Sequence, residues 1–221
     1  MSFVGSKGQA GVFQTIIGQM PPHEVYCEAF FGLGRVFWEK RPASRSFIID
    51  QRPELLTEAA KREDVHAICG DAISIVPTLT LLPGDLVYCD PPYLLSTRKG
   101  RKYYQHELTD EQHASLLTML QALKCYVLLS GYPSDLYGTA LQGWRCLEYT
   151  TRTRQKTITE CLWANFPEPQ KLHDWRYAGK NYRQRLTLKR LAARWLARLD
   201  AMPALKRGYI LNSIAQRQIR R

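Results

Sequence analysis

The sequence has no apolar run close to the roughly 20 residues that a helix needs to cross a lipid bilayer. Its first residues, with Gly, Ser, Lys and Gln, also lack the apolar core of a secretory signal. No internal repeat and no low-complexity segment is visible. These absences argue against a membrane span and a repeat architecture, and we expect a cytoplasmic protein with no membrane partner.

Cysteine and histidine are few and widely spaced. The six cysteines include no C-x-x-C pair, and the five histidines show no spacing typical of metal ligands. We therefore expect no disulfide framework, no thiol redox centre and no metal site. The cysteines, which lie mostly in apolar runs, are predicted to be reduced core residues.

Acidic residues are scarce only in the last quarter of the chain. Residues 167–221 contain fourteen Lys or Arg and three Asp or Glu, whereas residues 1–166 carry seventeen of each sign. The whole formal charge of +11 thus falls on the C-terminal segment. A neutral body with a basic tail is typical of proteins that bind a polyanion, because cationic side chains release counterions from phosphates. A solvated cationic helix is the alternative interpretation.

What the sequence does contain is a series of short apolar runs that alternate with helical patterns, which predicts a largely parallel sheet with helices on its faces. The expected strands are residues 25–29, 46–49, 67–69, 85–89, 126–130, 145–149 and 159–164. The last two would form an antiparallel hairpin around a loop at 150–157. We therefore expect an α/β, doubly wound, Rossmann-like sheet of seven strands over residues 1–166, followed by a helical extension over 167–221.

The helical patterns predict helices over residues 12–18, 34–40, 53–62 and 110–123. The last of these begins after Thr109, a suitable N-cap, and has acidic residues in its first turn. In the basic extension, residues 182–199 show an apolar face and an arginine face, and a second helix is expected from Pro203 to about residue 216. This helix-turn-helix-like pair could grip DNA or dock on the body.

The most specific motif is Asp90-Pro91-Pro92-Tyr93, which follows an apolar strand and so is expected at the sheet edge where doubly wound folds bind ligands. The Asp90 carboxylate and the Pro91 carbonyl can accept both hydrogens of an aromatic amine, which favours the pyramidal nitrogen of a transition state. The two prolines stiffen the turn. Tyr93 offers a flat face to a base swung out of a duplex. An ordinary strand-ending turn is the alternative.

Glycine and further acidic residues follow the other predicted strands. The segment from Glu28 to Gly34 indicates a strand that enters a glycine loop before a helix, where a nucleoside cofactor lies close to the backbone. Asp50 ends the next strand, at the position of a carboxylate that binds ribose hydroxyls. Asp71 follows the third strand. Acids at the ends of three consecutive strands indicate one shared site.

With these motifs the chain resembles the Dam-like class of DNA adenine methyltransferases, in its compact phage and prophage form. The resemblance covers residues 4–166 and follows the family order. It rests on Gly5-Ser6-Lys7, Glu28 to Gly34, Asp50, Gly70-Asp71, Asp90 to Tyr93, Thr97-Arg98, Tyr103-Tyr104, Leu129-Ser130-Gly131-Tyr132 and Thr159-Glu160-Cys161-Leu162-Trp163. It implies the methyltransferase variant of the doubly wound fold, S-adenosylmethionine as cofactor, and methyl transfer to the 6-amino group of an adenine flipped out of double-stranded DNA.

The resemblance also implies a role for each matching residue. Those that line the methionine end of the cofactor would be Lys7, Glu28, Phe30 and Gly32. Asp50 would hold the ribose hydroxyls, and Asp71 with its neighbour Ala72 would contact the cofactor's adenine. The residues that hold the target base would be Asp90, Pro91, Pro92 and Tyr93.

Two departures from the family pattern bear on function. Ala29 replaces the usual proline, and the loop reads F-G-L-G in place of a run of glycines, which predicts an altered cofactor affinity. Asp71 and Asp90 are only 19 positions apart, too few for the target-recognition domain that many members carry between them. We therefore expect relaxed sequence specificity.

Three basic segments could contact DNA in place of that domain. The first follows Asp90 to Tyr93, the predicted catalytic turn, and contains Arg98, Lys99, Arg101, Lys102, Tyr103 and Tyr104. The second is the hairpin loop with Arg152 and Arg154, and the third is the C-terminal extension. A solvated loop and an ordinary charged hairpin tip are the alternatives for the first two.

Other functions fit parts of the same pattern. The acceptor could be adenine in RNA or the amino group of cytosine, or the chain could be a DNA-binding module with a decayed site. An active enzyme is favoured because every expected polar group from Lys7 to Tyr93 is present. Restriction-modification, evasion of host restriction and regulation all stay open as roles for the methyl mark.

Overall fold

The computed structural model describes residues 7–9, 11–98, 106–152 and 157–219. The chain forms two compact units, Met1–Tyr177 and Ala178–Arg221. Residues 167–177, which follow the compositional boundary expected at 166, belong to the first unit because they bind to it. The backbone N–H of His173 donates to the carbonyl oxygen of Met20 at 2.9 Å, and the Asp174 carboxylate accepts the backbone N–H of Arg41 at 2.9 Å.

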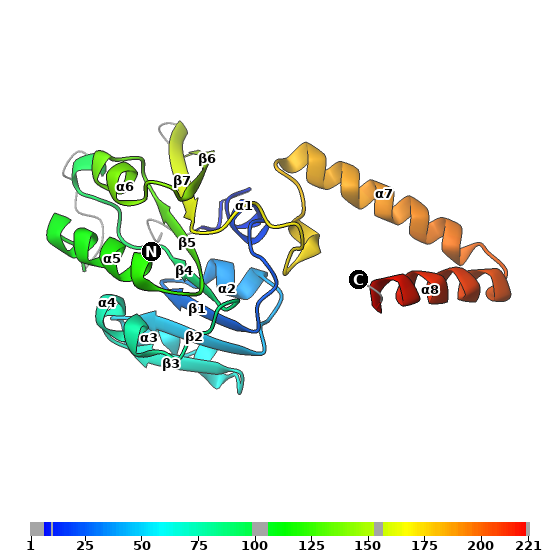
Figure 1. The fold of residues 1–221 in the computed structure, drawn as a ribbon, viewed down its shortest axis with the longest axis horizontal. Helices are drawn as coiled ribbons and strands as arrows, with labels where there is room; N and C mark the ends of the chain where they lie inside the picture. Colours follow the sequence, from blue (N-terminus) through cyan, green and yellow to red (C-terminus); the bar gives the residue numbers. More distant parts are fainter. Residues whose placement is uncertain (1–6, 10, 99–105, 153–156, 220–221) are drawn as a thin grey trace. The chain divides into compact units, whose positions relative to one another are not determined.

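A seven-stranded sheet forms the centre of the first unit, in the order β3-β2-β1-β4-β5-β7-β6 (Figure 1). Its strands are β1 (Val25–Ala29), β2 (Arg45–Asp50), β3 (Val65–Cys69), β4 (Leu86–Cys89), β5 (Tyr126–Gly131), β6 (Arg145–Arg152) and β7 (Thr157–Ala164). The first five are parallel, and β7 runs antiparallel between β5 and β6. The predicted doubly wound sheet with a terminal hairpin is confirmed. The hairpin is longer than predicted, because its ladder continues to the pair Arg152 and Thr157.

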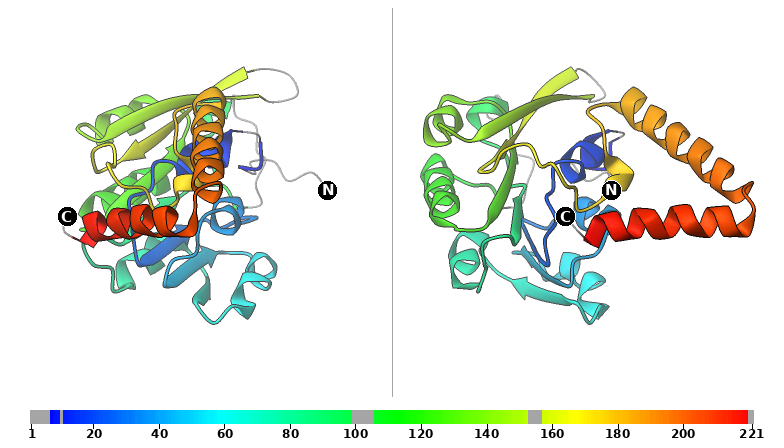
Figure 2. Two further views of the ribbon diagram at one scale, coloured as in Figure 1. Left: turned by 90° about the vertical axis from the view of Figure 1, so that its right-hand side faces the viewer. Right: turned by 45° about the vertical axis from the view of Figure 1, so that its right-hand side comes forward.

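Helices lie on both faces of this sheet (Figure 2). They are α1 (Val12–Ile17), α2 (Arg35–Glu39), α3 (Pro53–Leu56), α4 (Ala72–Ile75), α5 (Asp110–Ala122) and α6 (Asp135–Ala140), with 3-10 turns at Ala59–Lys61, Val76–Thr78, Ser96–Arg98 and Trp175–Tyr177. The continuous helix predicted over 53–62 is wrong. It divides into α3 and a 3-10 turn, which are separated by the turn residues Thr57 and Glu58.

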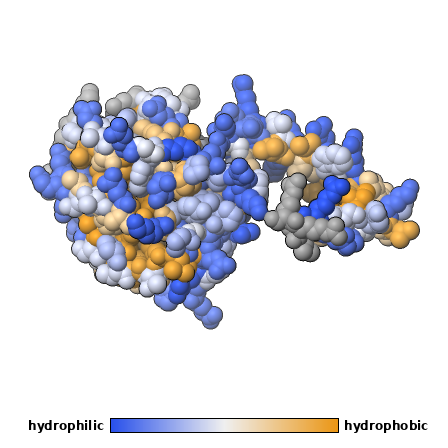
Figure 3. Space-filling view, in the orientation of Figure 1, coloured by the Kyte–Doolittle hydropathy of each residue, from blue (hydrophilic) through white to orange (hydrophobic). Residues whose placement is uncertain are grey.

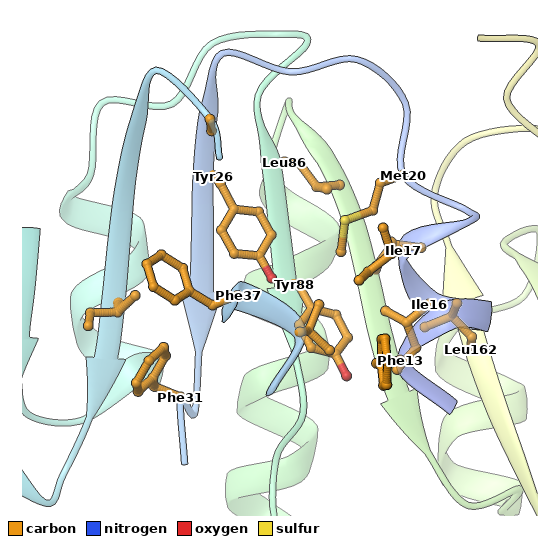
Figure 4. Close-up of a cluster of buried hydrophobic side chains, with 14 of the residues drawn as sticks. Phe13, Ile16, Ile17, Met20, Tyr26, Phe31, Phe37, Leu86, Tyr88 and Leu162 are labelled. Carbon is orange, nitrogen blue, oxygen red and sulfur yellow. The ribbon is translucent and has the colours of Figure 1, made fainter. Parts of the chain in front are cut away.

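Alternate residues of the central strands point to opposite faces, and both faces are buried, as expected of parallel strands. Tyr26 and Tyr88 pack with Phe13 and Ile16 of α1 on one face (Figure 4). Cys27, Ile49, Val87 and Leu129 pack with Leu116 and Leu120 of α5 on the other. Truncating a fully buried aliphatic side chain such as Ile16 would cost about 2–5 kcal/mol of stability.

The cysteines follow this layering only in part. The buried ones are Cys27, Cys89, Cys125 and Cys161, and all six are free thiols. Cys69 and Cys146 are exposed, which corrects their assignment to the core. They lie on β3 and β6, the two edge strands of the sheet, where one side has no neighbouring strand.

The carboxyl ends of the parallel strands place the site. The helix after β1 packs on one face of the sheet and the helix after β4 on the other, as the partners of Phe37 and Leu117 show. Because β1 and β4 are neighbours, the chain changes direction between them, and a crevice forms at that point of the sheet edge. The glycine loop follows β1 and the predicted catalytic turn, which begins at Asp90, follows β4, so both lie at this crevice.

The second unit contains the two predicted helices, α7 (Tyr182–Asp200) and α8 (Ala204–Ile219). The side chain of Asn181 caps α7 by accepting the backbone N–H of Gln184 at 2.9 Å. Large apolar side chains on both helices are exposed, including Trp195 at 55% and Leu205 at 87%, and Figure 3 shows hydrophobic residues on the surface of this unit. Across the described ranges, no helix combines the length and apolarity required to cross a membrane.

Candidate active site at the carboxyl edge of the sheet

A cavity of about 390 Å³ opens at the carboxyl ends of β1, β2 and β4. This size lies within the range of small-molecule sites, roughly 300–1,000 Å³. The predicted site residues that line it are Lys7, Glu28, Phe30, Gly32, Asp50, Ala72, Asp90 and Pro92. Residues from five separate chain segments therefore line one cavity, whereas the predicted site residues Asp71, Pro91 and Tyr93 do not line it.

The glycine loop curves around this cavity through left-handed backbone conformations. Phe30, Gly32 and Gly34 have φ angles of 61°, 56° and 61°. Such angles are uncommon for a residue with a side chain, and they concentrate at functional sites. Gly34 is required for a second reason, because a Cβ there would collide with the ring of Phe31. The loop thereby brings its backbone close to the cavity, as a nucleoside site requires.

Asp50 ties this loop to the end of β2. One carboxylate oxygen accepts the backbone N–H of Gly32 at 2.7 Å, and the other accepts the backbone N–H of Arg52 at 3.0 Å. The side chain is buried and lines the cavity. Oδ1 also accepts the Nε–H of Arg52 at 3.3 Å, whereas Oδ2 has a second lone pair. Asp50 can therefore both fix the loop and accept a hydrogen bond from a ligand hydroxyl.

Asp71 has a different place. Its carboxylate caps α4 by accepting the backbone N–H of Ile73 at 3.2 Å and the hydroxyl of Ser74 at 2.9 Å. Its neighbours Gly70 and Ala72 line the cavity, and Asp71 does not. The role for Asp71 in holding the cofactor's adenine therefore stays a prediction.

Glu28 is a buried carboxyl group in the cavity wall. The hydroxyl of Tyr26 donates to its Oε2 at 2.7 Å. Burial raises the pKa of Glu28 to about 8, although Tyr26 and the nearby Lys40 oppose this rise. Glu28 can thus respond to a cationic group that enters the cavity.

The catalytic turn begins at Asp90, immediately after β4. Lys7 Nζ lies 3.0 Å from Asp90 Oδ1 and 3.0 Å from Glu160 Oε2, and it also donates to the Tyr93 hydroxyl. Burial raises the pKa of Asp90, whereas the charge of Lys7 lowers it. Burial also opposes the charge on Lys7, but Asp90 and Glu160 hold its pKa above the usual value. Lys7 is therefore a buried cation between two carboxylates.

Glu160 on β7 completes this group, although the sequence analysis did not name it as a site residue. The hydroxyls of Tyr93 and Tyr149 donate to its Oε2 at 2.9 and 3.1 Å, and the hydroxyl of Thr151 donates to its Oε1 at 3.0 Å. Burial raises its pKa, but Lys7 and these hydroxyls together hold the pKa below its usual range. A lone carboxylate within an apolar strand was the available signal.

The structure describes only some of the basic residues that are predicted to contact DNA. Arg98 has a side chain only 6% exposed, and its guanidinium binds the carboxylate of Glu107. Its Nε–H also donates to the carbonyl oxygen of Tyr93 at 2.7 Å. For Arg152 only the backbone, in β6, is described. The remaining predicted contacts, Lys99, Arg101, Lys102, Tyr103, Tyr104 and Arg154, lie outside the described residues.

The start of α5 supplies a part of the cavity wall that was not among the predicted site residues. Leu108 and Gln112 line the cavity. Gln112 is held by a reciprocal cap in which its backbone N–H donates to the Thr109 hydroxyl at 3.2 Å and its side chain accepts the Thr109 N–H at 2.8 Å. The signal was present, because a helix that follows a strand of a doubly wound sheet begins at the ligand-binding edge. Within the described segments, no group of three or more His, Cys, Asp or Glu is placed to hold a metal ion.

Three comparisons relate this geometry to known proteins. Residues 50–155 match the model of the family described as D12 class N6 adenine-specific DNA methyltransferase. No curated protein matches the sequence significantly. Solved structures with similar folds include M. capricolum TrmK in complex with S-adenosyl-homocysteine, at 11% identity over 94% of this chain and 95% of that chain, with a TM-score of 0.49.

Two further solved structures are similar over shorter lengths. A dimethyladenosine transferase from Plasmodium falciparum is 12% identical over 71% of this chain and 62% of that chain, with a TM-score of 0.45. Magnesium protoporphyrin IX methyltransferase from Synechocystis PCC 6803, with bound SAM, is 15% identical over 66% and 71%, with a TM-score of 0.44. Such low similarities do not indicate a substrate. Over residues 50–155, which include Asp50, Asp90 and Tyr93, the chain is similar to the D12 class of N6 adenine-specific DNA methyltransferases.

Proposed function

We propose that this chain is an S-adenosylmethionine-dependent methyltransferase of the Dam-like type, which methylates the 6-amino group of adenine in DNA. One observation carries the proposal. Asp90, the first residue of the catalytic turn, lines the same cavity as Glu28, Phe30 and Asp50 of the expected cofactor site. A methyl donor and a methyl acceptor that bind in this cavity would therefore lie close together. The family match over residues 50–155 supports adenine as the acceptor.

The cavity residues fit S-adenosylmethionine in their chemistry. When bound, this cofactor supplies a methyl group on a sulfonium. Its ammonium group suits the buried carboxyl of Glu28, and its ribose hydroxyls suit the carboxylate of Asp50. Phe30 and Leu108 provide apolar lining for the remainder. The cavity of about 390 Å³ is large enough for a small-molecule cofactor.

The chain's own residues would favour the transfer by position and charge. The carboxylate of Asp90 and the carbonyl of Pro91 would accept the two amino hydrogens and keep the nitrogen lone pair free for attack. Lys7 stabilises the ionised form of Asp90, which burial alone would disfavour. Tyr93 would provide the stacking face for the flipped base. Alignment of the two reacting groups would supply much of the rate enhancement.

DNA is the proposed partner because of charge. The exposed arginines of α7 include Arg183, Arg190, Arg194 and Arg198, in a C-terminal segment that carries the full net charge of the chain. Such a helix can bind phosphates without reading sequence. Only 19 positions separate Asp71 from Asp90, and relaxed specificity is therefore part of the proposal.

The test is to express the wild type, Asp90→Ala and Glu54→Gln in a host that lacks adenine methylation, and to map modified bases by single-molecule sequencing. Glu54 is an exposed acid on α3 and serves as the matched control. Methylated adenines in the wild type and control, but not in the Asp90 variant, are expected. Unmodified DNA with intact cofactor binding would overturn the DNA assignment and direct the assay to RNA. A wild type that does not bind the cofactor would overturn the proposal that the chain is a methyltransferase.

A further inference from the structure

A buried carboxylate lies in β7, outside the segment that matches the family model. Glu160 is 8% exposed, and the match ends at residue 155. Burying a charge costs several kcal/mol unless it is paired and hydrogen-bonded. An apolar residue at this position would allow β7 to pack without that cost. The carboxylate therefore calls for an explanation beyond the stability of the strand.

Its partners supply that explanation, because two of the four, Lys7 and Tyr93, belong to the candidate active site. Glu160 Oε2 accepts from Lys7 at 3.0 Å and from the Tyr93 hydroxyl at 2.9 Å. Lys7 in turn binds Asp90 at 3.0 Å. The hydroxyl of Thr151 occupies the other oxygen, Oε1, at 3.0 Å, which fixes the plane of the carboxylate. Glu160 is thus one hydrogen bond from Tyr93 and two interactions from Asp90.

The hydroxyl, the backbone and the ring of Tyr93 are each held by a neighbouring residue. Glu160 accepts its hydroxyl, and Arg98 donates to its backbone carbonyl at 2.7 Å. Tyr132 packs against the ring at a centroid distance of 4.5 Å and an interplanar angle of 65°. Without the hydrogen bond to Glu160, the hydroxyl end of the ring would lose its carboxylate acceptor, and Lys7 would lose one of its two anions.

We propose that Glu160 is a positioning residue, which orients the Tyr93 ring for the target base and, through Lys7, places the carboxylate of Asp90. The inference rests on the proposed function, since it requires that Tyr93 stacks on a flipped base. Glu160 itself acts only through these two side chains. Substituting it should slow the transfer step while leaving the cofactor bound.

Glu160→Gln and Tyr93→Phe test this relation together. Gln keeps the size of the side chain but offers a single acceptor oxygen to four donors, and Phe keeps the stacking ring but removes the hydroxyl. The readouts are the single-turnover rate of methyl transfer, cofactor affinity, and the fluorescence of 2-aminopurine at the target adenine, which reports base flipping. Glu148→Gln on β6 is the matched control, an exposed carboxylate on the same hairpin.

We expect Glu160→Gln to lower the single-turnover rate about 10- to 100-fold, because small misplacements of reacting groups cost this much. Its 2-aminopurine signal should fall, cofactor affinity should change less than about threefold, and Glu148→Gln should match the wild type. Tyr93→Phe should show the part of these defects that depends on the Tyr93 hydroxyl. The losses of the double variant should be less than additive, because both changes remove the hydrogen bond between Glu160 and Tyr93.

Wild-type rates and fluorescence in Glu160→Gln, or additive losses in the double variant, would overturn the inference. A rate measured per cofactor-binding site separates positioning from a loss of folded protein. If Glu160→Gln fails to fold, Tyr93→Phe decides, since a wild-type rate and signal there would overturn the inference alone. A wild-type protein that methylates no adenine would instead overturn the proposed function.

Discussion

Arg98 donates its Nε–H to the carbonyl oxygen of Tyr93 at 2.7 Å, and its guanidinium binds Glu107. The residue that the sequence suggested as a phosphate contact thus links the catalytic turn to the segment that precedes α5. The side chain of Arg98 thus contacts both the backbone of Tyr93 and Glu107, a residue of the cavity wall.

Replacing Arg98 with Lys should therefore impair transfer more than DNA binding. Lys cannot bind the carboxylate and the carbonyl with the same planar fork, so we expect about a tenfold lower single-turnover rate. The slope of DNA affinity against salt should stay unchanged. In Arg98→Gln, which also removes the charge, a slope reduced by about one would instead identify Arg98 as a phosphate contact. Glu107→Gln is the companion variant and should reproduce the slower transfer.

Asp50 and Asp71 are predicted to differ in what their loss costs. Asp50→Asn keeps one acceptor oxygen and replaces the other with a donor NH2 group, so either Gly32 or Arg52 loses its acceptor. This should loosen the glycine loop and weaken cofactor binding by about 10- to 100-fold, measured by calorimetry. Asp71→Asn should mainly weaken the cap of α4, at a cost of about 1 kcal/mol or less in unfolding free energy. A larger loss of cofactor affinity in the Asp71 variant would support the adenine contact that the family resemblance implies.

Cofactor binding should depend on pH through Glu28. Burial raises the pKa of Glu28 to about 8, so below that pH the side chain carries a proton in the cofactor-free protein. A bound ammonium group favours the ionised carboxylate, and binding must then release this proton. We expect affinity to strengthen about tenfold from pH 6 to 7.5, with proton release detected by calorimetry in two buffers. Glu28→Gln should bind more weakly and lose this dependence, and an unchanged pH profile would contradict the assignment.

The regular parts of the fold were predictable because their patterns are local. The central strands are apolar on both faces, and α5 carries its N-cap and leucine spacing in adjacent residues. Neither α4 nor α6 was predicted, because α4 has only four residues and α6 contains Gly138, a weak helix former. Of the three strand-end acids, Asp50 and Asp90 line the cavity because parallel strands end at one edge, and Asp71 does not line it.

The interactions within the site were harder to predict, because they join distant positions. Glu160 lies 153 positions from Lys7 and 67 from Tyr93, and only the insertion of β7 beside β5 brings them together. The pairing of Arg98 with Glu107 likewise depends on the path of the chain between them. Sequence patterns identify charged residues, but the partner that each one binds is set by the tertiary fold.

Lys7 should control the ionisation of Asp90. Burial already raises the pKa of Asp90, and Lys7, at 3.0 Å, is the group that most opposes this rise. In Lys7→Met the pKa of Asp90 should therefore rise further, and the acidic limb of the single-turnover pH profile should move to higher pH. Lys7→Arg keeps the charge and should shift the limb less. An unmoved limb in Lys7→Met would show that Asp90 does not set it.

The basic face of α7 allows the last prediction, which separates DNA contact from docking. Replacing Arg183, Arg190, Arg194 and Arg198 with Gln removes four exposed charges without altering the apolar face. If each binds a phosphate, the salt slope should fall by up to about 3.6, and DNA affinity should drop at low salt. Cofactor affinity serves as the internal control and should not change. Unchanged DNA binding with a lower unfolding temperature would instead show that these arginines stabilise the folded protein and do not contact DNA.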